Sequence, residues 1–251
     1  MLSPLMNRLL NVNEIYLSLQ GESTFAGLPC VFVRLTGCNL RCSYCDTAYA
    51  FFEGSKIGFE AILERVQELS NPYQDARSSH GGRLPLVELT GGEPLLQAGS
   101  VDLMRELCDR GFTVLVETSG AWDARTLDPR IHRIFDMKCP SSGESHRNFI
   151  ENLSDLRPTD EIKFVIATRE DYDWASERIR EHRLAGKCSL LFSWAAPLAE
   201  AQRHASLKPF PQTHHPISRL ELVESIVRDA LPVRFQVQMH KVIWAPDQKG
   251  V

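Results

Sequence analysis

Three cysteines, Cys38, Cys42 and Cys45, are grouped with CxxxCxxC spacing in the segment Gly-Cys-Asn-Leu-Arg-Cys-Ser-Tyr-Cys-Asp-Thr. Three neighbouring thiolates can hold three irons of a [4Fe–4S] cluster and leave the fourth iron open to a small molecule. A structural zinc would need a fourth ligand, which Cys139 or a distant histidine would have to supply, and a redox dithiol is a further alternative. The spacing favours an iron–sulfur cluster with an open iron.

A second segment, Thr90-Gly91-Gly92-Glu93-Pro94, has residue types that suit a small ligand. Glycines let the backbone approach a ligand closely, and a glutamate can accept hydrogen bonds from an ammonium group. Taken alone, the segment is more typical of a tight turn between a strand and a helix than of a ligand site. Beside a three-cysteine cluster it indicates a binding site.

The composition is ordinary for a soluble globular protein. The chain has 251 residues, 43% of them hydrophobic, and a net charge of −4, so no excess of basic residues indicates nucleic-acid binding. No apolar run approaches membrane-spanning length, and the first ten residues are too short and too weakly charged for a signal peptide. We therefore expect a single cytoplasmic domain over residues 1–251, with no nucleic-acid or membrane partner.

Hydrophobic periodicity predicts alternating strands and helices. Strands are expected at 12–19, 30–36, 86–89, 112–116, 131–137, 161–167, 189–192 and 233–239. Helices are expected at 59–69, 100–110, 171–183 and 218–230, and loops at 71–83 and 195–217. This alternation predicts an α/β fold of βα units with a parallel sheet.

Polar or glycine-rich residues follow six of these strands. They are the cysteine segment, 90–94, 117–120, 138–143, Ser193, and the pair Gln238 and His240. Because the carboxyl ends of parallel strands meet on one side of such a fold, we expect a shared active face there. Gln236, Gln238 and His240 are expected on one face of the last strand, from the period of two.

The cysteine segment together with Thr-Gly-Gly-Glu-Pro resembles the radical S-adenosylmethionine (SAM) enzymes. Residues 13–22, 26–27, 31–34, 45–47 and 236–244 further resemble the 7-carboxy-7-deazaguanine synthase (QueE) family. That resemblance implies a partial (β/α) TIM-like barrel, usually homodimeric. It also implies a lyase that converts 6-carboxy-5,6,7,8-tetrahydropterin to 7-carboxy-7-deazaguanine with release of ammonia, in queuosine and deazapurine biosynthesis. SAM would be regenerated, and an electron donor such as flavodoxin or ferredoxin would be needed.

The same resemblance implies a role for individual residues, with no catalytic residue beyond the cofactor-bound radical. The cluster ligands would be Cys38, Cys42 and Cys45, and Thr47 would bind Mg²⁺. The SAM contacts would be Tyr44, Cys45, Asp46, Gly92, Glu93, Glu117, Lys138 and Ser193. The pterin contacts would be Leu19, Gln20, Gly21, Arg34, Thr90, Gln238 and His240.

Two features depart from the family pattern. Ser23 stands where Gly-Glu-Gly is usual, and Asp136-Met137 stands where Ser-Pro usually precedes Lys138. Two alternatives also stay open. A glycyl-radical activating enzyme would use the same cysteine spacing but would need a protein partner, and a non-enzymatic zinc or iron–sulfur module would need a fourth protein ligand.

Overall fold

The computed structural model describes residues 8–78, 82–245 and 248–251. Its centre is a nine-stranded sheet in the order β3-β1-β2-β4-β5-β6-β7-β8-β9. The strands are β1 (Leu9–Leu19), β2 (Pro29–Leu35), β3 (Ser55–Gly58), β4 (Leu86–Gly91), β5 (Val114–Thr118), β6 (His132–Met137), β7 (Glu161–Ile166), β8 (Ser189–Trp194) and β9 (Arg234–Gln236). Strand β1 is antiparallel to both neighbours, and every pairing from β2 to β9 is parallel. The sheet is curved and open, as in a partial TIM-like barrel.

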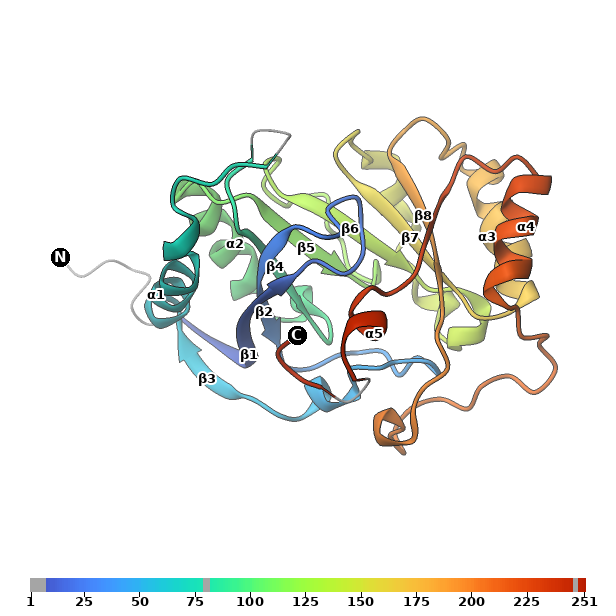
Figure 1. Cartoon of the computed structure of the whole chain (residues 1–251), viewed down its shortest axis with the longest axis horizontal. Coiled ribbons are helices and arrows are strands. Elements are labelled where there is room, and N and C mark those ends of the chain that lie inside the picture. Colours follow the sequence, from blue (N-terminus) through green and yellow to red (C-terminus); the bar gives the residue numbers. More distant parts are fainter. Residues whose placement is uncertain (1–7, 79–81, 246–247) are drawn as a thin grey trace.

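Helices cover the outer side of this sheet. They are α1 (Phe59–Ser70), α2 (Gly99–Asp109), α3 (Arg169–Glu181) and α4 (Arg219–Arg228). The short α5 (His240–Ile243) lies instead on the inner side, and the Met239 N–H just before it donates to the Gly21 carbonyl. Figure 1 shows α1 and α2 at one end of the molecule, α3 and α4 at the other, and α5 near the middle. This arrangement leaves the inner side of the sheet for a site.

The amphipathic pattern of each helix explains its placement. In α1, Ile62, Leu63 and Val66 recur at helical spacing and are buried in a core shared with α2 and strands β1, β2, β4 and β5. A second core joins α3 and α4 to β7 and β8. Capping boxes begin both of these helices, one formed by Thr168 and Asp171 and the other by Ser218 and Glu221.

A smaller apolar cluster fills the bottom of the inner side. Its buried members come from β2, β4, β5 and β6, and they are Cys30, Phe32, Leu86, Leu115 and Ile134. This apolar layer closes the barrel at the amino ends of the parallel strands. The polar residues at the carboxyl ends therefore lie above a packed apolar layer.

The predicted elements are present, with two shifts that affect the site. Strand β5 begins and ends two residues later than expected, so Glu117 lies within the strand. The predicted strand at 233–239 was wrong in its second half, because β9 ends at Gln236 and the chain turns into α5. Gln238 and His240 therefore do not share a strand face with Gln236.

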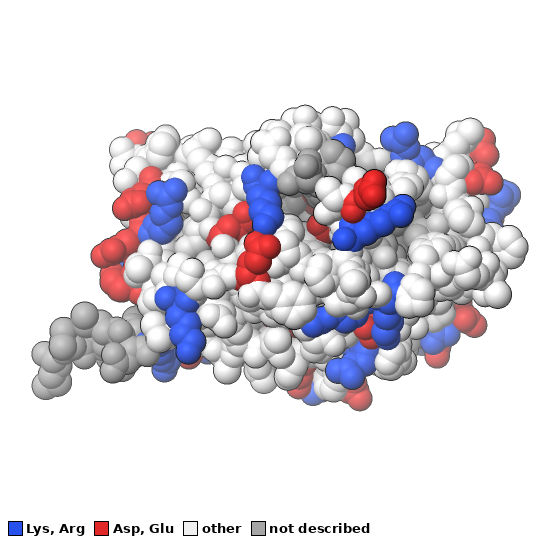
Figure 2. All heavy atoms as spheres, turned by 90° about the horizontal axis from the view of Figure 1, so that it is seen from below, with Lys and Arg blue, Asp and Glu red and all other residues white. Residues whose placement is uncertain are grey.

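Three smaller differences concern loops and unpredicted elements. The sequence did not predict β3 or a 3₁₀ helix at Ala48–Phe51. Within the expected loop at 71–83, residues Asn71–Tyr73 form a 3₁₀ turn, and residues 79–81 lie outside the described part. Among the described residues no helix is long and apolar enough to cross a membrane. Figure 2 shows that acidic and basic side chains are interspersed on the face seen from below.

Candidate active site

A cavity of about 540 Å³ opens at the carboxyl ends of the parallel strands. Most of the sequence-predicted site residues line it: Leu19, Gln20, Gly21, Arg34, Cys38, Cys42, Tyr44, Cys45, Asp46, Thr47, Thr90, Gly92, Glu117, Lys138, Gln238 and His240. Glu93 and Ser193 are buried close by and do not line it. The shared active face expected from the strand ends is thus one cavity.

The three cysteines are unpaired thiols on the wall of this cavity. Burial raises the pKa of the Cys42 thiol to about 12, so the surrounding protein disfavours the thiolate. The backbone N–H of Leu40 donates to Cys38 Sγ at 3.4 Å. A bound metal would favour the thiolate forms, and three cysteines on one wall suit a metal cluster.

Polar atoms beside the cysteines have no partner in the described part of the chain. Tyr44 Oη and Asp136 Oδ1 are buried without a hydrogen bond, and both residues line the cavity. Because unsatisfied buried polar atoms are costly, they fit a polar ligand that would bind between them. The residues present therefore suit a cluster-bound polar cofactor such as SAM.

The cysteine loop is held by the segment after β6. The Arg41 N–H donates to Glu144 Oε1 at 2.8 Å, and Ser43 Oγ donates to the Ser141 carbonyl at 2.6 Å. The Arg41 guanidinium lies 4.2 Å from the centre of the Phe51 ring. These contacts fix the position of the loop that carries the cysteines.

The two glycines of the Thr-Gly-Gly-Glu-Pro turn allow it to pack directly on the cysteine loop. A Cβ at Gly92 would lie 2.2 Å from the Gly37 carbonyl oxygen and 2.7 Å from Cys38 Cβ. Gly91 has a φ of 159° and equally close backbone at Leu35. The Glu93 N–H donates to the Gly37 carbonyl at 2.8 Å. The sequence suggested glycines for close approach to a ligand, and the structure shows close approach to the loop that carries the cysteines.

The Glu93 carboxylate is fully occupied by internal donors. It accepts from the Leu95 N–H at 3.0 Å, from Thr118 Oγ1 at 2.9 Å, and from both the N–H and the hydroxyl of Ser119. Its side chain is completely buried. This geometry fastens the turn to the end of β5 and gives no support to a SAM contact by the carboxylate.

Asp46 links the cysteine loop to α5. Its Oδ2 lies 2.6 Å from Lys241 Nζ and accepts from Gln238 Nε2 at 3.3 Å. Burial would raise the pKa of Asp46, but Lys241 outweighs it and lowers that pKa below its usual range. Thr47 Oγ1 lies 3.7 Å from Cys45 Sγ, and its side chain does not cap the following 3₁₀ helix. The Thr47 side chain is thus available to the cavity.

Arg34 reaches the cavity from β2 while paired with neighbours on β1. Its Nε donates to Glu14 Oε1 at 2.8 Å and its Nη2 donates to Tyr16 Oη at 2.9 Å. The Tyr49 hydroxyl donates to the same Glu14 oxygen at 3.0 Å. No described residue accepts a hydrogen bond from Nη1, so Arg34 keeps donors for an anionic ligand.

A buried cluster of charges forms one side of the cavity. Lys163 Nζ contacts Glu22 Oε2 at 2.8 Å, the Glu117 carboxylate, and Asp136 Oδ2 at 3.7 Å. Asp136 also pairs with Lys138 at 2.9 Å. Burial opposes the charge on Lys163, but the carboxylates of Glu117 and Glu22 raise its pKa. Ser193 lies behind this cluster and donates to Glu22 at 3.1 Å.

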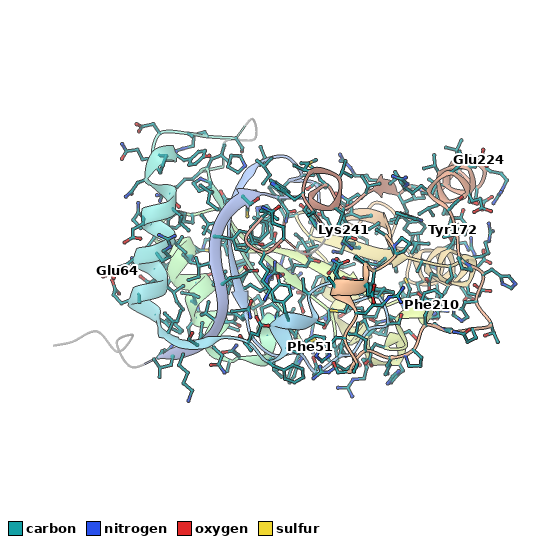
Figure 3. The ribbon with its side chains drawn as sticks, turned by 60° about the horizontal axis from the view of Figure 1, so that its bottom comes forward. Phe51, Glu64, Tyr172, Phe210, Glu224 and Lys241 are labelled. Carbon is teal, nitrogen blue, oxygen red and sulfur yellow. The ribbon has the colours of Figure 1, made fainter. Side chains whose placement is uncertain are left out.

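Among the described residues, sequence reasoning missed eight charged residues of the cavity wall: Glu22, Glu53, Glu88, Asp136, Lys163, Arg203, Lys241 and Lys249. A signal existed for two of them, because Glu88 and Lys163 interrupt otherwise apolar strands. A charge inside a buried strand needs a partner or a function. Figure 3 shows Lys241 and Phe51 in the middle of the molecule, whereas Glu64 and Glu224 lie at its two ends.

The two departures from the family pattern have local structural consequences. Ser23 has a φ of 64°, a left-handed conformation that glycine adopts without strain. Its hydroxyl accepts from the Phe25 N–H at 3.0 Å, which partly offsets the strain. Asp136 adds a carboxylate to the cavity between Lys138 and Lys163.

The segment 195–217, which the sequence predicted as a loop, contacts the cysteine loop. The Lys208 N–H donates to the Arg41 carbonyl at 2.9 Å, and its Nζ pairs with Glu144 at 3.0 Å. The rings of His204 and Phe52 lie 5.8 Å apart. Four residues in or directly after the 3₁₀ turn Glu200–Gln202 line the cavity: Ala201, Gln202, Arg203 and His204.

Comparisons with known proteins agree with this site. Residues 32–138 match the model of the radical SAM superfamily. The chain is 44% identical to the 7-carboxy-7-deazaguanine synthase of Koribacter versatilis, over 96% of this chain and 100% of that protein. It is also 44% identical to the synthase of the same name from Chlorobaculum tepidum, over 96% and 97%. The crystal structure of QueE from Escherichia coli shares the fold, with a TM-score of 0.64 and 20% identity over 92% of this chain and 95% of that one.

Proposed function

The chain belongs to the 7-carboxy-7-deazaguanine synthase family of radical SAM enzymes, and from this premise we propose the reaction that it catalyses. It converts 6-carboxy-5,6,7,8-tetrahydropterin to 7-carboxy-7-deazaguanine and ammonia, a step in the biosynthesis of queuosine and other deazapurines. One observation carries this proposal: the three cysteines line the same cavity as Gln20 and Arg34. Neither a glycyl-radical activase nor a metal-binding module accounts for a substrate-sized cavity with these residues.

The radical SAM family implies a [4Fe–4S] cluster and SAM, and when bound they supply the radical that starts the reaction. Cys38, Cys42 and Cys45 would hold the cluster. The nearby polar groups of Tyr44, Glu117 and Lys138, together with the backbone of Gly92, would hold SAM. The buried carboxylates next to Lys163 suit a cofactor with a positively charged sulfonium and ammonium group, because opposite charges attract strongly where water is excluded.

The pterin would lie between Arg34 and the loop that follows β1. The free Nη1 of Arg34 can donate to the substrate carboxylate, as guanidinium groups commonly do. The backbone of Leu19 and Gly21, with Gln20 and Thr90, offers donors and acceptors to the ring. Gln238 and His240 approach from α5 and its preceding turn, since the Met239 N–H donates to the Gly21 carbonyl at 3.0 Å.

Thr47 would hold a Mg²⁺ ion, which would supply positive charge for the substrate carboxylate. Thr47 lines the same cavity as Arg34, and Mg²⁺ keeps water ligands while binding substrate oxygens. Arg34 is already neutralised by Glu14, so a metal ion would supply the positive charge that the substrate carboxylate needs.

We extend the proposal to the state of the protein in the cell. Residues 1–251 would act as one radical SAM domain, because β1 to β9 form one continuous sheet. The protein would work as a homodimer in the cytoplasm, where seven unpaired cysteines stay reduced. A flavodoxin or ferredoxin would deliver the electron.

Anaerobic reconstitution of the cluster tests the cofactor assignment directly. Iron content and visible absorbance would be measured for the wild type, Cys42→Ala and Cys188→Ala. Cys42→Ala should lose the cluster and the activity. Cys188 is partly buried and does not line the cavity, so Cys188→Ala should keep both. A Cys42→Ala protein with a full cluster would contradict the assignment.

A further inference from the structure

We infer that Glu88 recognises the 2-amino and N3–H edge of the pterin ring and so determines specificity for a 2-aminopyrimidinone substrate. This inference rests on the proposed function and adds a residue that the resemblance did not supply. It is carried by the position of Glu88, by its missing counter-ion, and by the chemistry of the ring that would face it.

Glu88 sits at the bottom of the cavity on β4. Its side chain is 1% exposed and lines the cavity. In the parallel pairing of β2 with β4, Phe32 lies opposite Glu88 and Arg34 lies opposite Thr90. Glu88 is therefore two residues deeper than Thr90 on the same strand face, against Phe32 and the apolar layer. Figure 1 shows β2 and β4 as neighbours in the sheet.

This depth matches the shape of a carboxypterin. Two residues along a strand span about 7 Å, so Arg34 and Glu88 lie at different levels of the cavity. A carboxypterin is a flat bicyclic ring with its carboxylate at one end and its 2-amino group at the other. With the carboxylate at Arg34, the pyrimidine end points down towards Glu88 and the ring lies against Phe32 and Tyr16, whose own rings stack at 5.1 Å.

Glu88 is also the acidic residue of the cavity wall that lacks a cationic partner. Within the described chain, every other acidic side chain that lines the cavity forms a salt bridge: Glu22, Asp46, Glu53, Glu117 and Asp136. Among described residues, only the Gln20 amide donates to the Glu88 carboxylate. Gln20 in turn accepts from the Glu22 N–H at 2.7 Å, so its amide orientation is fixed.

The pKa of Glu88 is consistent with a carboxylate that has too few hydrogen-bond donors in the protein itself. Burial, followed by the nearby Glu117 carboxylate, raises the pKa of Glu88 well above its usual range. Hydrogen bonds to the ionised form would lower that pKa again. A ligand with two adjacent N–H groups would therefore complete the site.

The pyrimidine end of a pterin presents that pair, because its 2-amino group and N3–H are adjacent donors. An ionised carboxylate accepts both with its two oxygens. A lumazine has a carbonyl oxygen in place of the 2-amino group. That oxygen would face a carboxylate oxygen of Glu88, and neither atom can donate a hydrogen bond. Replacing Glu88 with glutamine would present one donor and one acceptor, which suits the lumazine edge better than the pterin edge.

The experiment is a pair of fluorescence titrations on the reconstituted enzyme with SAM present. The probes are 6-carboxypterin and 6-carboxylumazine, and the variants are Glu88→Gln and Glu161→Gln. Glu161 is a matched control, because it is buried on β7 of the same sheet, accepts from Thr24, and does not line the cavity. The wild type and Glu161→Gln should bind the pterin at least about tenfold more tightly than the lumazine, whereas Glu88→Gln should lose that preference.

Equal affinities of the wild type for the two probes would overturn the inference, whatever the variants do. An unchanged preference in folded Glu88→Gln would overturn it as well. Turnover of 6-carboxytetrahydropterin by the wild type, measured in parallel, separates this inference from the proposed function. Product formation with equal probe affinities overturns only the role of Glu88, whereas no product and no 6-carboxypterin binding overturns both.

Discussion

The Nζ of Lys241 lies 2.6 Å from the Oδ2 of Asp46. This ion pair joins the short helix α5 to the residue that follows Cys45. The two partners are almost 200 positions apart in the chain, and both side chains are largely buried. The ion pair therefore fixes the C-terminal segment over the cavity and positions Asp46 beside Cys45 and Thr47.

The first prediction tests this pair. Lys241→Met should destabilise the protein by about 2 kcal/mol, because the buried Asp46 carboxylate loses its strongest partner. The measurement is urea unfolding under anaerobic conditions. Lys249→Met is the control, since its pair with Glu53 is half exposed and should contribute less than about 1 kcal/mol. Equal effects of the two substitutions would contradict the structural role of the Asp46 pair.

The second prediction concerns the contact between the glycine turn and the cysteine loop. Gly92→Ala should reduce the iron bound after reconstitution and destabilise the fold by about 2 kcal/mol or more, because its Cβ has no room against Gly37 and Cys38. A Cβ at Gly58 meets nothing within 4 Å, so Gly58→Ala should bind iron normally. Full iron content in Gly92→Ala would show that the turn does not position the cysteines.

The third prediction concerns Lys163, which is 3% exposed at its side chain. Lys163→Met leaves Glu22 and Glu117 buried without a cation and should cost about 3–5 kcal/mol in chemical denaturation. Adding Glu117→Gln in the same chain should recover part of that loss, because one uncompensated charge is removed. The exposed Lys187→Met serves as the control. No recovery in the double variant would argue against charge compensation as the reason for Lys163.

The fourth prediction is a pH dependence from His132. Burial lowers the pKa of His132 below the usual histidine value of about 6.5, and its ring packs edge-on against Phe25. Between the folded and unfolded pKa values the unfolded chain binds more protons, so stability should fall as the pH drops below about 6.5 and level off below the folded pKa. Unfolding of the wild type and His132→Asn at pH 7.5 and 5.5 measures this. The variant should lose part of the decrease, and an identical decrease in both proteins would refute the assignment to His132.

The alternating fold and the cysteine loop could be predicted from the sequence because both depend on local patterns. Apolar periodicity placed the strands and helices, and CxxxCxxC spacing singled out three cysteines that line the cavity before any contact was known. The carboxyl ends of the parallel strands then had to meet, which explains why Thr90 and Lys138, far apart in the sequence, were expected to line one cavity. Gln20 follows the antiparallel β1, so only the family resemblance placed it there.

Contacts between distant segments could not be predicted in the same way. The ion pairs of Lys163 and Asp46 join residues whose proximity depends on the curvature of the sheet and on the path of α5. The strand predicted at 233–239 failed because polar residues alternated there without a strand, and the contact between Met239 and Gly21 bends the chain instead. The internal role of the Glu93 carboxylate likewise depends on Ser119, which follows a different strand.

The most direct measurement is the balance of products from the reconstituted enzyme. The wild type would be incubated without oxygen with 6-carboxytetrahydropterin, SAM, Mg²⁺ and a reductant, and the products would be quantified by mass spectrometry and an ammonia assay. The proposed function predicts equal amounts of 7-carboxy-7-deazaguanine and ammonia, with more product formed than SAM consumed. Cleavage of SAM without any deazaguanine would contradict it.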